Sequence, residues 1–433
     1  MGERAARRVG TAAAGWLCAA LVCPSLATVD VARLGNGAVV AVDVRPGSPT
    51  DAAAVAFAWA DGMAGVGSPH RAAIAAVLGE SALSGLSALA VDGARAVCEP
   101  LPEALVLSIV GPAGCASQLA DVLVWSVTAP ANADLALRAA DAASPAETSD
   151  PQVAVTRAMM DGLLSPGPGA AGYPELRAAL AGPNGPELLD QLRGAECAGE
   201  RCGASLVGSH AVEDARSGLL LGLERLPRGT ARARSWLPPI TPGRIEVSYD
   251  AGTAYVGLGY RLPGSDSPEV PGFVVLQRLL GDGNGSLLFQ RLRGELDLTY
   301  TVGAELGIAR SHGWLCLWSG CPLGDRERAL AEMHRVVEEV RSSVDTADVT
   351  RARRRAIFEI EARRHRPSVW APHLAAQLAT GLSPEYDAGL QAALERWTGD
   401  DTVRTARTWL TSALEVVGNP GPPASRQTNT PPR

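Results

Sequence analysis

The order of strands and helices is repeated along this chain of 433 residues, and that repeat constrains the fold more than any other feature. Residues 29–34 and 38–44 have the composition of strands, and Asn36-Gly37 between them is a strong tight-turn pair. A strand over residues 53–60, a helix over 70–83, a hairpin and further helices follow. The series restarts near residue 245. We therefore predict a tandem duplication of one α+β unit, with the two copies roughly two hundred residues apart.

The second copy has the same order of elements as the first. Strands are predicted over residues 245–249, 254–261, 300–306 and 314–318, and helices over 270–280, 326–340 and 347–366. Within the Ala-, Pro- and Gly-rich stretch of residues 130–174, only residues 153–164 have a helical pattern. The two copies and their flanks predict five segments. These are a signal peptide (1–27), a first half (28–228), an Arg- and Pro-rich linker (229–243), a second half (244–418) and a disordered tail (419–433).

The N-terminus has the features of an export signal. Arg4, Arg7 and Arg8 form a positive region, residues 9–22 are mostly apolar, and Ser25-Leu26-Ala27 offers a cleavage site. A lipoprotein signal at Cys23 and a twin-arginine signal at Arg7-Arg8 are weaker alternatives. The apolar run is too short to span a bilayer comfortably, and no later segment is more apolar. We expect a periplasmic or secreted protein without an integral membrane segment.

Composition excludes several functions. The chain contains no lysine, which rules out a phosphate-binding P-loop and a pyridoxal Schiff base. A net charge of -7 gives no reason to expect nucleic-acid binding.

Six of the eight cysteines lie beyond the predicted signal peptide, and an even number in an exported chain favours disulfides. Cys197 and Cys202 flank a short polar loop, so a local bridge between them is a candidate. Cys316 and Cys321 would lie ~16 Å apart on a straight strand, which is too far for a bond. Zinc binding by the thiols is less favoured, because the chain has no C-x-x-C pair.

One stretch carries a specific resemblance: residues 279–302, LLGDGNGSLLFQRLRGELDLTYTV. A turn with Gly281, Gly283 and Gly285 leads into a short helix with Arg293, and Tyr300 follows at the head of a strand. This resembles the second half of insulinase-type (pitrilysin, processing-peptidase) zinc metallopeptidases, whose Arg and Tyr at this spacing hold the substrate backbone. The resemblance implies a clam-shell of two α+β halves, each a mostly antiparallel sheet covered by helices.

In that family the first half carries His-x-x-Glu-His, but the corresponding residues here are Ala76-Val77-Leu78-Gly79-Glu80. Such a site needs two imidazoles one helical turn apart and a carboxylate that takes a proton from the metal-bound water. Ala76 replaces the first ligand, Gly79 the base and Glu80 the second ligand, and no two histidines are spaced i, i+4. We predict no metal, no cofactor and no catalytic residue in this chain.

The glycine run has two interpretations. A GxGxG series could hold a phosphate, but no Walker lysine follows, and the family resemblance explains Gly281, Gly283 and Gly285 as a tight turn. The run also resembles, in shortened form, the Gly-rich loop of non-catalytic processing-peptidase subunits, which contacts substrate.

The resemblance implies a zinc-less subunit of a two-chain exported peptidase. Arg293 and Tyr300 would donate hydrogen bonds to the carbonyls of a peptide or unfolded polypeptide held as an added strand, while zinc lies on an insulinase-type partner. Taken alone, the pair could also be a solvated helix arginine and a half-buried strand tyrosine. Two alternatives stay open: an inert structural or peptide-binding homologue without a role in proteolysis, like core subunits of respiratory complexes, and an autonomous metallopeptidase with unorthodox ligands.

Overall fold

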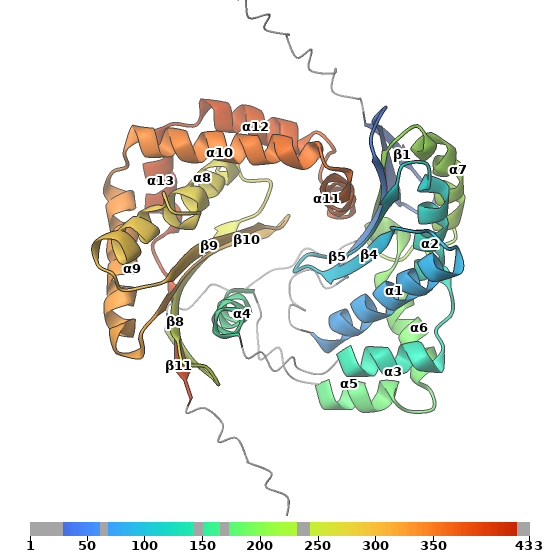
Figure 1. The fold of residues 1–433 in the computed structure, drawn as a ribbon, viewed down its shortest axis with the longest axis horizontal. Coiled ribbons are helices and arrows are strands. Elements are labelled where there is room, and N and C mark those ends of the chain that lie inside the picture. Colours follow the sequence, from blue (N-terminus) through green and yellow to red (C-terminus); the bar gives the residue numbers. More distant parts are fainter. Residues whose placement is uncertain (1–28, 61–67, 143–149, 165–172, 232–242, 422–433) are drawn as a thin grey trace, which may run out of the picture.

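The computed structural model describes residues 29–60, 68–142, 150–164, 173–231 and 243–421. It contains two β-sheets, one in each half of the chain, and each sheet is covered by helices (Figure 1). The predicted signal peptide, most of the predicted linker and residues 422–433 lie outside the described residues. No helix in the described ranges is both long and apolar enough to cross a lipid bilayer.

The sheet of the first half has six strands in the order β1-β2-β6-β3-β5-β4. β2 and β6 run parallel, and the other neighbours are antiparallel. Its strands are β1 (Asp30–Arg33), β2 (Val39–Val44), β3 (Thr50–Ala58), β4 (Arg95–Pro100), β5 (Ala104–Pro112) and β6 (Cys202–Gly208). Its helices are α1 (Pro69–Ala88), α2 (Ala116–Thr128), α3 (Ala133–Ala142), α4 (Pro151–Leu164), α5 (Tyr173–Leu180), α6 (Gly185–Glu196), the 3₁₀ turn η1 (Gly199–Arg201) and α7 (Ala211–Leu223).

The sheet of the second half has five strands in the order β7-β11-β8-β10-β9. Its strands are β7 (Gly243–Tyr249), β8 (Ala254–Pro263), β9 (Thr301–Ile308), β10 (His312–Cys321) and β11 (Leu414–Pro420). Its helices are α8 (Val270–Gly281), the π-helix η2 (Phe289–Glu295), the 3₁₀ turn η3 (Leu323–Asp325), α9 (Arg326–Ser342), α10 (Thr346–Arg364), α11 (Pro367–Ala379), α12 (Tyr386–Arg396) and α13 (Gly399–Trp409).

The two sheets have the same topology, which confirms the predicted α+β duplication. Apart from β1, which has no counterpart among the described strands of the second half, the orders match: β6 inserts between β2 and β3, and β11 inserts between β7 and β8. β6 runs parallel to β2, and β11 runs parallel to β7. The hairpin β4–β5 in the first half corresponds to β9–β10 in the second, and β4 and β9 each form a sheet edge. The match follows the chain order of the helices as well, so that α1 corresponds to α8 and α4 to α11.

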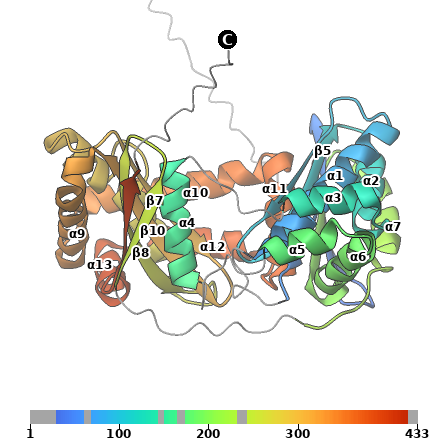
Figure 2. The same ribbon diagram turned by 90° about the horizontal axis from the view of Figure 1, so that it is seen from below.

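The corresponding helices α4 and α11 are exchanged between the halves. α4 belongs to the first half but packs its apolar stripe on the sheet of the second half, and α11 packs on the sheet of the first half (Figures 1 and 2). The stripe of α4 consists of Val155, Met159 and Leu163, spaced four residues apart, and all three are fully buried. Each half therefore supplies one helix to the core of the other.

Small residues allow these helices to approach the sheets closely. A Cβ atom at Gly203 in β6 would lie 2.3 Å from the carbonyl oxygen of Ala375 in α11. A Cβ atom at Gly257 in β8 would lie 2.6 Å from the sulfur of Met159 in α4. Real Cβ atoms do not approach other atoms so closely. A side chain at position 203 would therefore displace the backbone of α11, and one at position 257 would displace the side chain of Met159.

Three details differ from the predicted elements. The stretch of residues 130–174 contains α3 in addition to α4. Tyr300 precedes β9 by one residue, and Asn419 and Pro420, assigned to the tail, end β11. The buried residues of α3 are all alanines, Ala136, Ala139 and Ala140, and such small residues mark a buried face less clearly than large apolar ones.

Candidate functional site

Arg293 and Tyr300 lie against each other at the start of edge strand β9. The guanidinium carbon of Arg293 is 4.7 Å from the centre of the Tyr300 ring, a cation–π contact. Arg293 Nη1 also donates to the carbonyl oxygen of Thr299 at 3.1 Å. Tyr300 is 81% exposed, so the phenol is presented to solvent. The alternative interpretation, in which Tyr300 is a half-buried residue of a strand, is therefore wrong.

Thr299 fixes the backbone beneath this pair. Its buried hydroxyl lies 2.9 Å from the carbonyl oxygen of Thr301 and accepts from Ser319 Oγ at 3.0 Å and from the amide of Thr301 at 3.2 Å. These bonds hold the chain on both sides of Tyr300. A guanidinium has five N–H donors. Within the described ranges the guanidinium of Arg293 makes one hydrogen bond, to Thr299, so donors remain for a ligand.

The glycine run before η2 is a structural turn. α8 ends at Gly281, where a Cβ atom would lie 2.5 Å from the Cβ of Ala304 in β9. Gly283 has φ +79°, which favours glycine, whereas a Cβ atom at Gly285 would meet nothing within 4 Å. Asp282 lies in the same turn, paired with Arg278 at 2.7 Å. A carboxylate there disfavours a phosphate and supports the interpretation as a tight turn.

The positions of the missing metal motif share one partly exposed face of α1. Ala76, Gly79 and Glu80 lie one turn apart or adjacent on that face. Glu80 Oε1 is 4.0 Å from Arg138 Nη1 of α3, so its one carboxylate already faces a cation. In the part of the chain that the structure describes, no group of three or more His, Cys, Asp or Glu side chains is arranged to hold a metal ion. The residues at this site do not fit a zinc ion.

Cys197 follows α6 and Cys202 begins β6, and both are buried in the core of the first half. Both are free thiols in the structure, so the suggested bridge does not join them there. Burial raises the pKa of the Cys197 thiol to about 12 and raises the pKa of Cys202 further. Thiols in this environment are poor nucleophiles at neutral pH.

A cavity of about 450 Å³ lies between the halves. Its walls are formed by the first turn of α1, the β4–β5 turn, one face of the exchanged helix α4, and β9. The lining residues are Ser68, Arg71, Ala72, Pro100, Leu101, Pro102, Gln152, Val153, Thr156, Arg157, Met160, Asp161 and Glu305. No sequence motif marks this cavity, because segments from four distant parts of the chain meet here.

The carboxyl groups of this cavity have perturbed protonation equilibria. Burial raises the pKa of Asp161, and the charge of Arg157 only partly opposes that effect. Burial also raises the pKa of Glu305, which is accessible from the cavity but closely surrounded by protein. Carboxyl groups with such pKa values in a cavity are candidates for ligand binding.

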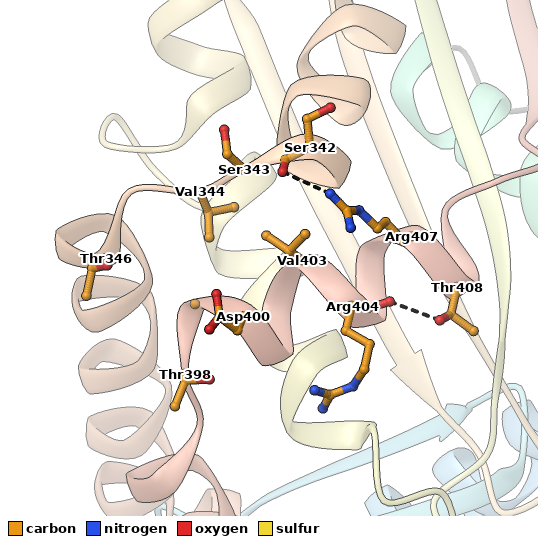
Figure 3. Close-up of a pocket in the computed structure, with 11 residues that line it drawn as sticks. Ser342, Ser343, Val344, Thr346, Thr398, Asp400, Val403, Arg404, Arg407 and Thr408 are labelled. Carbon is orange, nitrogen blue, oxygen red and sulfur yellow. Dashed lines mark hydrogen bonds between the residues drawn. The ribbon is translucent and has the colours of Figure 1, made fainter.

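A second cavity, of about 710 Å³, is formed by the second half alone (Figure 3). It lies between the end of α9, the first turn of α10 and one face of α13. Its two arginines are already engaged, since Arg407 donates to the carbonyl of Ser342 at 3.2 Å and Arg404 pairs with Asp401 at 2.7 Å. Thr398 caps α13 through a reciprocal bond with Asp401. We assign this cavity to the packing of helix ends.

Comparison with known proteins supports the resemblance seen in the sequence. Residues 223–356, which include the glycine turn, Arg293 and Tyr300, match the family model described as "Peptidase M16 inactive domain". Over this segment the chain is similar to insulinase-type (M16) peptidases. Its sequence contains no His-x-x-Glu-His.

Curated relatives of the chain are described as uncharacterized zinc proteases. Those from Mycobacterium tuberculosis and Mycobacterium bovis are 33% identical to it over 125 residues, and that from Mycobacterium leprae is 33% identical over 115 residues. The first of these matches covers 29% of the chain and 26% of the relative, so the matched segment spans about a quarter of the curated protein.

Solved structures extend the similarity in fold over nearly the whole chain. A peptidase M16 inactive domain from Pseudomonas fluorescens has a TM-score of 0.75 at 16% identity and covers 91% of this chain and 98% of its own. A putative M16-like peptidase from Alicyclobacillus acidocaldarius has a TM-score of 0.69 at 14% identity, with 91% and 98% covered. A chain of complex III2 from Candida albicans has a TM-score of 0.66 at 12% identity, with 90% and 96% covered. These likenesses establish the two-half M16 fold.

Proposed function

We propose that this chain is an exported, non-catalytic subunit that grips a peptide for a zinc-bearing insulinase-type partner. The observation that carries the proposal is the Arg293–Tyr300 pair, which presents two hydrogen-bond donors at an exposed position, while the Ala76–Glu80 segment lacks metal ligands. The chain would supply the grip, and the partner would supply the zinc and the base.

The position of the pair supports peptide binding by strand addition. β9 is the edge of its sheet and pairs with β10 alone among the described strands, so its outer N–H and C=O groups can accept an extended peptide. Arg293 and Tyr300 lie at the N-terminal end of that edge. A guanidinium and a phenol there can donate to the peptide carbonyls that strand pairing leaves unpaired.

The order at this site also supports the proposal. Thr299 holds the backbone on both sides of Tyr300, and the cation–π stack restricts Arg293. Donors that are already oriented lose less entropy when a ligand binds. A solvated surface arginine would not need either restraint.

The test is to combine the purified chain with an insulinase-type partner that carries His-x-x-Glu-His and to measure kcat/KM for a fluorogenic peptide. We expect activity from the mixture and little from either chain alone. Arg293→Ala and Tyr300→Phe should each lower kcat/KM about tenfold or more, the loss expected for one charged or oxyanion donor. Arg328→Gln, at an exposed position in α9, is the matched control and should leave the rate unchanged.

If the two variants leave the mixture's activity intact, the gripping role is wrong. If the chain binds its partner stably but never stimulates cleavage, the inert structural homologue is the correct description. Metal analysis of each purified chain separates both outcomes from an autonomous enzyme, which requires stoichiometric zinc in this chain.

A further inference from the structure

Asn-Gly pairs occur in the chain at residues 36–37, 184–185 and 284–285, and their surroundings differ. We propose that Asn284 is a site of spontaneous covalent modification, at which the side-chain amide is lost and the residue becomes a mixture of isoaspartate and aspartate. The turn that contains it connects α8 to η2, the helix that carries Arg293. The proposal concerns the chemistry of this turn and does not depend on the gripping function.

The reaction joins the backbone to the side chain. Hydroxide removes the proton from the Gly285 amide, and the nitrogen attacks Cγ of Asn284. The Cγ–Nδ2 bond breaks, the leaving nitrogen takes a proton from water, and ammonia departs from a five-membered succinimide. Water then opens this ring at Cγ, which gives aspartate, or at the main-chain carbonyl carbon, which gives isoaspartate. One water is consumed for each ammonia released. Glycine favours the attack because it has no Cβ atom to restrict its backbone.

The groups that react are accessible at residues 284–285. Asn284 and Gly285 are both exposed, and a Cβ atom at Gly285 would meet nothing within 4 Å. Within the described ranges, neither the side chain of Asn284 nor the N–H of Gly285 forms a hydrogen bond. The turn is closed by a bond from the N–H of Ser286 to the carbonyl oxygen of Gly283 at 3.1 Å. Opening of this exposed turn lets the nitrogen approach Cγ.

The pair at residues 36–37 is restrained at both reacting groups. Nδ2 of Asn36 donates to the carbonyl oxygens of Leu223 at 2.8 Å and Leu226 at 3.1 Å. The N–H of Gly37 donates to the carbonyl oxygen of Leu34 at 3.0 Å. An intramolecular attack requires the two atoms to approach in a defined geometry, and these bonds hold them away from it.

The pair at residues 184–185 is restrained through its backbone. Gly185 is buried at the start of α6, and its N–H donates to the carbonyl oxygen of Gly182 at 3.0 Å. A Cβ atom at Gly185 would lie 2.0 Å from the carbonyl oxygen of Leu180, so the chain has no room to rotate there. The fold therefore protects two of the pairs and leaves residues 284–285 open to the reaction.

Modification would change both the charge and the length of the turn. The new carboxylate lies two residues from Asp282, which already pairs with Arg278 at 2.7 Å and with Arg355 at 3.0 Å. Isoaspartate also lengthens the backbone by one methylene just before η2. Aged protein should therefore separate on anion exchange into the parent form and a more acidic form.

The test is to incubate the folded full chain at mildly alkaline pH and to digest it with trypsin at mildly acidic pH. Trypsin cuts after arginine, so the pairs lie on separate peptides, residues 34–71, 178–193 and 279–291. Fragmentation in the mass spectrometer locates each change from amide to acid, and protein isoaspartate methyltransferase labels the isoaspartyl product. We expect deamidation at Asn284 to be about tenfold or more faster than at Asn36 and Asn184, because their reacting atoms are held out of line.

Two comparisons assign the difference to the structure. In concentrated urea, the three pairs should react at similar rates, because the restraints at residues 36–37 and 184–185 are removed. Gly285→Ala should slow the reaction of the folded chain at Asn284 about tenfold, since alanine restricts the backbone that must rotate. Gly218→Ala, at an open position of α7, is the control and should react as the parent does.

Thermal melting of each variant establishes that it is folded. Arg293→Ala should deamidate at the parent rate, so a failure of the gripping function leaves this result unaffected. The proposal is overturned if the peptide 279–291 of the folded chain keeps its mass, or if the three pairs react equally in the folded chain. An unchanged rate in folded Gly285→Ala would also overturn it.

Discussion

Trp370 of helix α11 donates its indole N–H to Asp43 of strand β2, with 2.9 Å between Nε1 and Oδ2. The two residues belong to different halves of the chain, and both are buried. Ser205 Oγ donates to the carbonyl of Ala371 at 2.7 Å beside them. These bonds fix the register of α11 on the first sheet, so the exchange of helices is held by specific polar contacts in addition to apolar burial.

Replacing Trp370 by Phe should lower the free energy of unfolding by about 2 kcal/mol, because a buried hydrogen bond to a charged acceptor is lost. Asp43 keeps its ion pair with Arg45, which limits the cost. Urea unfolding followed by far-UV circular dichroism measures the change. Trp125→Phe, at a residue 45% exposed on α2, is the control and should stay within about 0.5 kcal/mol. Equal effects of the two substitutions would contradict this account of α11.

Cutting the chain between the halves should leave them associated. With a protease recognition sequence introduced into residues 232–242 and then cleaved, the two fragments should elute together in size-exclusion chromatography. The reason is that α4 is buried against the second sheet and α11 against the first. Separate half-size peaks in native buffer would refute the association of the two halves.

The same cut chain shows whether the exchanged helix holds the halves. Gly203→Ala would place a Cβ atom 2.3 Å from the Ala375 carbonyl oxygen and displace α11. The cut Gly203→Ala chain should therefore dissociate at a lower urea concentration than the cut parent. Gly218→Ala in α7 has open space at its Cβ and serves as the control.

A buried polar cluster connects α11 to α12 and should make stability depend on pH. Asp387 accepts hydrogen bonds from His373 at 3.0 Å and from Gln377 at 2.8 Å, and it pairs with Arg363 at 3.3 Å. Burial by itself would raise the pKa of Asp387, but the bond and charge of His373, with Arg363 and Gln377, lower it below the ordinary value. A carboxyl whose pKa is lowered by folding stabilises the protein above its unfolded pKa, and that contribution disappears as pH falls through the folded value.

Asp387→Asn should therefore lower the free energy of unfolding by about 2 kcal/mol at pH 7. The difference from the parent should shrink below about pH 4, near the unfolded pKa of aspartate. Urea unfolding of variant and parent at a series of pH values between 7 and 3 measures this difference. Asp214→Asn, at an exposed position in α7, is the control. A difference that stays constant down to pH 3 would contradict the assigned ionisation.

The glycine turn gives a matched pair of substitutions. Gly281→Ala should destabilise the protein by about 2 kcal/mol or more, because its Cβ would lie 2.5 Å from the Ala304 Cβ and 2.7 Å from the Ala304 amide nitrogen. Gly285→Ala meets open space and should change stability by less than about 0.5 kcal/mol. Thermal melting distinguishes the two. Equal destabilisation would show that the turn does not have this packing.

Local patterns were sufficient to predict most elements of the fold. The apolar periodicities of residues 270–280 and 326–340 correspond to α8 and α9, and the alternation in residues 254–261 to β8. Repetition of that order predicted the duplication that the two sheets confirm.

The sequence by itself determined that the chain has two similar halves and that residues 76–80 lack the imidazoles and the carboxylate of a zinc site, because side-chain chemistry and periodicity are local properties. Only the tertiary structure decided that α4 and α11 exchange sheets, that Tyr300 is exposed against Arg293, and that Asp161 and Glu305 both line one cavity. An apolar stripe shows that a helix must be buried, but many sheets offer a suitable face. The partner is selected by long-range packing, at positions such as Gly203, where a side chain would collide with the backbone of the exchanged helix α11.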